Sequence, residues 1–168
     1  MLGLTTLGII HTAISLVAVA TGIVILARER RIRYATAAGK LYVHATVLTC
    51  LTSLGIFQHG GFGKPHVLAI ITLVTLGVAQ AAIKTTWFGH RSAYVEMVAY
   101  SATVLFHFIP ALTETRTRLP FGAPFFANAD DPLVKMLTGT LVLLFLVGAT
   151  LQVLWPRRQR FIEAPQTL

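Results

Sequence analysis

Six histidines are the residues of this sequence with the most evident potential for cofactor chemistry. They are His11, His44, His59, His66, His90 and His107. Imidazole in a helical bundle is the usual axial ligand of haem, and it also binds copper or zinc and relays protons. Dihaem membrane cytochromes often place two histidines at a fixed spacing on one helix, and this chain has no such pair. The spacing therefore leaves haem, a metal ion and a proton relay open.

A polar stripe follows one of the helices that must position these histidines. Glu96, Tyr100, Thr103, His107 and Glu114 recur at helical spacing within and just beyond residues 94–113. A charge at the centre of a bilayer costs roughly 2.5–3.5 kcal/mol on insertion scales, so the stripe should face other helices rather than lipid. An alternative is that these side chains only hydrogen-bond across helices as part of the packing.

Three further segments carry polar faces that can meet this stripe. Their polar and small members are His11, Ser15, Ala18 and Gly22; then Tyr42, Thr46, Thr49 and Ser53; then His66, Gly77, Gln80 and Lys84. His44 is rotated away from the second of these faces. Residues 141–147 are nearly all aliphatic, so the last segment is expected at the periphery of the bundle.

Composition and hydropathy identify the class of protein. Charged residues make up 12% of the chain and hydrophobic residues 55%, against about a quarter charged residues in a soluble domain. Apolar residues occur in blocks long enough to cross a bilayer. We expect an all-α integral membrane bundle of about five helices, near 3–27, 41–57, 66–88, 94–113 and 133–155. Residues 1–168 should form a single transmembrane domain with a four-helix polar-seamed core and a peripheral fifth helix.

The basic residues indicate the orientation of the bundle. With the first loop inside, the inner side holds Arg28, Arg30, Arg31, Arg33, Lys40, Lys84, Arg91, Arg157, Arg158 and Arg160, and the outer side holds Lys64, Arg116, Arg118 and Lys135. The ten basic residues on the inner side against four on the outer side predict an outside N-terminus and an inside C-terminus. The expected location is a bacterial cytoplasmic membrane. No basic face for nucleic acid is expected, because these residues lie at segment ends. His11, His66 and His107 then belong to the outer half, and His44 and His90 to the inner boundary.

Several short motifs resemble an uncharacterised bacterial family of predicted membrane proteins, a domain of unknown function. The motifs are His11-Thr12, the Gly39 to Tyr42 stretch, Gly61-Phe62-Gly63 followed by His66, and Glu114-Thr115-Arg116-Thr117-Arg118-Leu119-Pro120. The family has His-Arg where this chain has Ala35-Thr36. The resemblance implies no activity. Five candidate site residues match the family pattern, namely His11, His66, His90, Glu114 and Arg118, whereas His44 and His107 do not match it.

The favoured hypothesis is a membrane protein that binds a cofactor or metal, haem first, through His11, His66 and His107 and serves electron transfer. A second hypothesis is an accessory or structural subunit of a larger membrane complex, or one that self-associates. A third is a proton-coupled carrier that uses the Glu96, Tyr100 and Thr103 stripe. Glu114 and Arg118 are expected as an ion pair at the outer end, where they could also shape its mouth. No nucleophile–base triad or phosphate-binding loop is found.

Overall fold

The computed structural model describes residues 5–57, 61–118 and 131–163, without the side chains of 114–118 and 155–163. The elements are α1 (Thr6–Glu29), α2 (Ala37–Leu54), α3 (Lys64–Lys84), a 3-10 turn η1 (Gly89–Arg91), α4 (Ser92–Arg118) and α5 (Pro132–Glu163). The described ranges contain helices and no strand, so the prediction of an all-α chain is confirmed.

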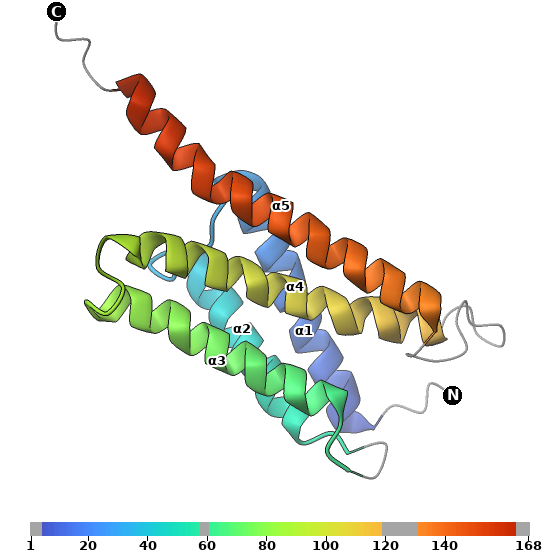
Figure 1. Ribbon diagram of the computed structural model, residues 1–168. Coiled ribbons are helices and arrows are strands. Elements are labelled where there is room, and N and C mark those ends of the chain that lie inside the picture. The colour runs from blue at the N-terminus through green and yellow to red at the C-terminus, as the bar shows by residue number, and fades with distance from the viewer. Residues whose placement is uncertain (1–4, 58–60, 119–130, 164–168) are drawn as a thin grey trace, which may run out of the picture.

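The first four helices form a closed ring, and the fifth lies outside it (Figure 1). Helix α1 packs on α2 and α4, α3 packs on α2 and α4, and α5 packs on α4. An apolar stretch of α5 that is long enough to span a membrane has no buried residue. The predicted four-helix core with a peripheral fifth helix is therefore confirmed.

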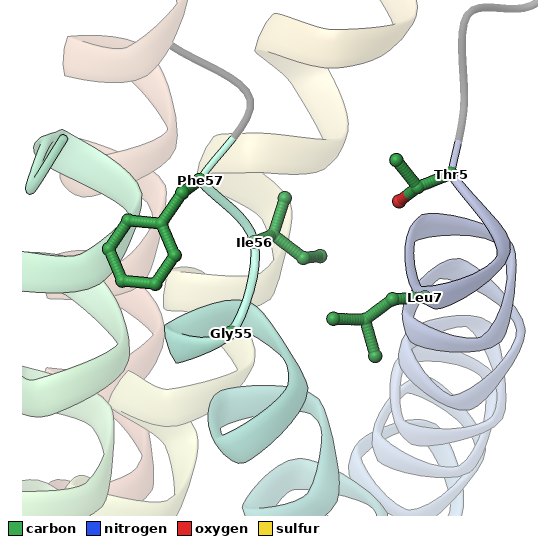
Figure 2. Close-up of a pocket in the computed structure, with 5 residues that line it drawn as sticks. All are labelled: Thr5, Leu7, Gly55, Ile56 and Phe57. Carbon is green, nitrogen blue, oxygen red and sulfur yellow. The ribbon is translucent and has the colours of Figure 1, made fainter. Parts of the chain in front are cut away.

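Four helical segments are long and apolar enough to cross a membrane. They are Thr6–Glu29, Lys64–Lys84, Gly89–Thr113 and Pro132–Leu154. Helix α2 is the shortest of the five α-helices, and it returns the chain along α1. Its end, at Gly55 and Ile56, lies beside Thr5 and Leu7 at the start of α1 (Figure 2). Its 18 residues span about 27 Å, close to the thickness of the hydrocarbon core. The chain is an integral membrane protein.

The connection between α1 and α2 is a tight turn, and it explains why α2 begins at Ala37 rather than at Leu41 as predicted. The hydroxyl of Thr36 accepts from the backbone N–H of Gly39 at 3.0 Å and so caps the helix. A Cβ at Gly39 would lie 1.8 Å from the carbonyl oxygen of Arg33, so only glycine fits there. We call this end of the bundle, with Arg28, Arg30, Arg31 and Arg33, the basic end.

Tyr42 occupies the centre of the ring of helices. Its side chain is 0% exposed. A Cβ added at Gly22 of α1 would meet Tyr42 Cε2 at 2.9 Å and Val104 Cγ2 at 3.2 Å, so α1 approaches α2 and α4 closely at this point. A small residue that lets backbones approach is a common feature of membrane helix interfaces.

Candidate functional site

Buried polar side chains follow α4 at Tyr100, Thr103 and His107, and we call this row the polar seam. A pair of hydroxyl groups joins it to α2. Tyr42 Oη and Thr103 Oγ1 lie 2.7 Å apart, and both residues are fully buried. Thr103 donates its hydroxyl proton to the carbonyl oxygen of Tyr100 at 2.7 Å. Because a threonine hydroxyl has only one proton, Tyr42 is the donor to Thr103. The bond therefore has a defined direction and ends on the α4 backbone.

His107 is held against α2 in the same way. Its Nε2 lies 3.1 Å from the hydroxyl oxygen of Thr46, and the imidazole is buried. Thr46 donates its own proton to the carbonyl oxygen of Tyr42 at 2.8 Å. His107 must therefore donate from Nε2, which leaves the lone pair of the neutral ring on Nδ1.

His11 has the opposite tautomer. Its Nδ1 lies 3.1 Å from the carbonyl oxygen of Thr49 and 3.0 Å from the hydroxyl of Thr52. A carbonyl can only accept, and Thr52 donates its own proton to the α2 backbone. His11 is therefore protonated on Nδ1, and the lone pair of the neutral ring lies on Nε2. His11 also lies near enough to His107 that a charge on one imidazole would act on the other.

The seam continues toward the basic end through Tyr100 of α4. Gln80 of α3 donates from its side-chain amide to the Tyr100 hydroxyl at 2.7 Å. One helical turn earlier on α4, Glu96 is half-buried, and its carboxylate interacts with the charges of Arg31 and Arg33 and with the Tyr34 backbone. The predicted stripe thus runs from the α1–α2 turn at Glu96 to the interior at His107.

His66 lies in surroundings of its own, at the start of α3. Its Nδ1 accepts from the backbone N–H of Gly63 at 3.2 Å, as in a capping box. Its ring is inclined by 31° to that of Phe57 and by 30° to that of Phe62, with centroids 4.8 and 5.3 Å away. The side chain is 3% exposed, and Nε2 has no hydrogen-bond partner among the described residues.

The other predicted site residues lie nearer the surface or outside the description. His44 is exposed, and its Nε2 lies 3.4 Å from the Tyr34 hydroxyl. His90 is exposed on η1. Helix α4 includes the backbone of Glu114 and Arg118, whose side chains are outside the described part of the chain, as is all of His59.

Two functional contacts were not anticipated from the sequence. Gln152 of α5 donates to the carbonyl oxygen of Arg30 at 2.7 Å and accepts from the Ser101 hydroxyl at 3.0 Å. The available signal was that Gln152 is the one amide in the apolar span Pro132–Leu154. The second contact is Thr52 with His11, which depends on the register between α1 and α2.

The histidines predicted to converge do not form one cluster. Among the described residues no group of three or more His, Cys, Asp or Glu side chains is placed to hold a metal ion. His11 and His107 instead flank the same stretch of α2 from two sides, on Thr49 and Thr46. His66 lies apart from both, at the start of α3 against the rings of Phe57 and Phe62. A ligand shared by His11 and His107 fits this arrangement better than one shared by all three.

Comparison with family models, curated proteins and solved structures gives no match for this chain. The resemblance of its motifs to a family of predicted membrane proteins therefore stays a prediction. One of those motifs, the Gly39 to Tyr42 stretch, nevertheless has a physical explanation here. Gly39 admits the Arg33 carbonyl, and Tyr42, three residues later, fills the centre of the bundle.

Proposed function

We propose that this chain is a membrane electron-transfer protein that holds a redox-active metal, as haem iron or as a bare ion, on His11. The observation that supports this proposal is the hydrogen bond from His11 Nδ1 to the Thr49 carbonyl. Histidines that ligate metals almost always donate their other ring N–H to a carbonyl or carboxylate, which fixes the tautomer and the ring orientation. His11 has this arrangement, and Thr52 reinforces it.

His107 is the second nitrogen ligand in this proposal. Its hydrogen bond to Thr46 leaves the Nδ1 lone pair of the neutral ring for a metal, and a charge on either imidazole would act on the other. Imidazole suits iron, copper and zinc, of which iron and copper change oxidation state. The metal would supply the redox change when bound. The protein would supply two oriented imidazoles in an interior that is closed by Tyr42 and Val104.

The proposed location is a bacterial cytoplasmic membrane, with the N-terminus outside. The excess of Lys and Arg on the side of the α1–α2 turn supports this orientation. His11 and His107 would then lie in the outer half of the bilayer. Labelling of single cysteines placed at Arg28 and at Lys64, from outside intact cells, tests the orientation. Labelling at position 28 alone would reverse it.

A second candidate function is that of an accessory subunit in a larger membrane complex or a self-assembly. One observation favours it: α5 presents an apolar face, including Leu143, Leu144 and Leu151, that none of the residues described by the structure covers. Such a face meets either lipid or a partner helix. Gentle extraction from native membranes tests this candidate, because a subunit should migrate with other chains. A single monomeric species would argue against it.

The proton-coupled carrier ranks below these two. In the described conformation the hydroxyl protons of Thr46 and Thr103 end on backbone carbonyls, so the seam does not form a continuous relay. Proteoliposome flux that depends on Glu96 or His107 would restore this candidate.

The proposal is tested by the absorption spectrum of protein purified without added cofactor, recorded before and after reduction. Haem on His11 would give a Soret band that shifts on reduction. A bare ion would give no such band, but stoichiometric iron or copper by elemental analysis. Protein with neither signal would contradict the proposal.

A further inference from the structure

The imidazole of His66 carries a hydrogen-bond donor that no other residue in the described part of the chain uses. Because Nδ1 accepts from the Gly63 backbone, the proton of the neutral ring lies on Nε2. That N–H is buried and has no acceptor among the described residues. An unsatisfied buried donor costs about 1–3 kcal/mol, so such a group commonly serves a ligand or an internal water.

The surroundings of this donor are aromatic and lie at the surface of the bundle. The rings of Phe57 and Phe62 pack against the imidazole at 31° and 30°, yet the two residues are 58% and 66% exposed. Large apolar rings exposed at the start of a membrane helix face the lipid or its interface. A ligand that reaches His66 past these rings must therefore be apolar, flat enough to lie against an aromatic ring, and equipped with a hydrogen-bond acceptor.

An apolar groove adjoins this cluster. It has a volume of about 290 Å³ and is lined by Thr5, Leu7, Gly55, Ile56 and Phe57. Figure 2 shows that Ile56 and Leu7 point into the groove, whereas the Phe57 ring points away from them. Phe57 thus forms the wall between the groove and His66.

We propose that His66, Phe57 and Phe62 form a binding site for a lipid-soluble quinone. A quinone ring is planar, its carbonyl oxygens accept from an N–H, and its tail partitions into the membrane. The His66 Nε2–H would donate to one carbonyl, the phenylalanine rings would lie against the quinone ring, and the groove would take the first part of the tail. The site depends on these residues alone and not on a metal at His11.

Photolabelling in nanodiscs with an azidoquinone, competed by decylubiquinone, tests this site. The expected result is competable labelling of the peptide that carries Phe57 and His66. His66→Gln should retain most of the labelling, because a glutamine at this capping position can accept from Gly63 and still donate. His66→Phe, which loses the donor, should weaken binding about five- to tenfold, the loss of one hydrogen bond. Val67→Ala, on an exposed neighbour, is the matched control.

The outcomes separate the proposal from its alternatives. Labelling that is absent, or equal in wild type and His66→Phe, would overturn the quinone site and leave an internal water as the partner of Nε2. Competition by oleic acid but not by decylubiquinone would assign the donor to a carboxylate lipid and would also overturn it. If His66→Phe does not fold, Phe62→Leu provides the second test, because it retains the donor but should weaken labelling. None of these results depends on the metal content of the protein.

Discussion

His11 donates its Nδ1 proton to the carbonyl oxygen of Thr49 across 3.1 Å, from one membrane helix to the next. This bond fixes the imidazole tautomer with its lone pair on Nε2, the nitrogen that a metal would take. His107 approaches the same stretch of α2 from α4, through Thr46. The predictions below test this interior and the packing that positions it.

Replacing Gly22 by alanine should destabilise the bundle by about 1–3 kcal/mol, as overpacked cores generally do. The added Cβ would lie 2.9 Å from the ring of Tyr42, which has no free space around it. Thermal unfolding in detergent measures the change. Gly77→Ala is the matched control, because nothing lies within 4 Å of its added Cβ. It should be neutral or stabilising by up to about 1 kcal/mol. Equal effects at the two positions would contradict this packing.

The hydroxyls of Tyr42 and Thr103 should show a coupling energy of about 0.6 kcal/mol in a double-mutant cycle, the average for polar pairs between membrane helices. Tyr42→Phe and Thr103→Val each remove one side of the pair. The free energy of unfolding of the two single variants and the double variant gives the coupling. The pair Tyr42→Phe with Thr150→Val should be additive, because Thr150 bonds only within α5 on its exposed face.

Gln152→Leu should loosen α5 from the bundle and lower stability by about 1–2 kcal/mol, because it removes two hydrogen bonds. These bonds join Gln152 to Ser101 and to the Arg30 carbonyl. Hydrogen exchange of α5 amides should increase more than that of α3 amides. Leu151→Ala, on the exposed face of α5, serves as the control. Unchanged exchange in Gln152→Leu would show that apolar packing alone holds the helix.

Thr52→Val should lower the affinity for the proposed metal about tenfold while the fold is retained. The change removes one of the two acceptors of His11 Nδ1–H, and groups that orient a ligating histidine typically contribute 10–100-fold. Competition with a chelator of known affinity measures the metal affinity. Thr75→Val, which removes a hydroxyl bonded within α3, should leave the affinity unchanged. An equal loss in both variants would count against a specific role of Thr52.

The sequence alone was sufficient to predict the helical bundle and its peripheral fifth helix, because hydrophobic blocks and charge placement follow from the bilayer. It also placed Tyr100, Thr103 and His107 on one face of α4, since a helical repeat converts spacing into direction. It could not reveal that His11 contacts Thr49 while His107 contacts Thr46, because that depends on the register between three helices. Nor could it show the aromatic contacts of His66, which arise where two chain segments meet.

The metal content of the purified protein tests the central claim most directly. Protein from cells supplied with iron and copper is analysed as wild type, His11→Ala and His44→Ala. The account predicts one iron or copper per chain in wild type and in His44→Ala, because His44 is exposed at the basic end, and a loss of most of that metal in His11→Ala. Wild-type protein without stoichiometric metal, or His11→Ala with undiminished metal, would contradict it.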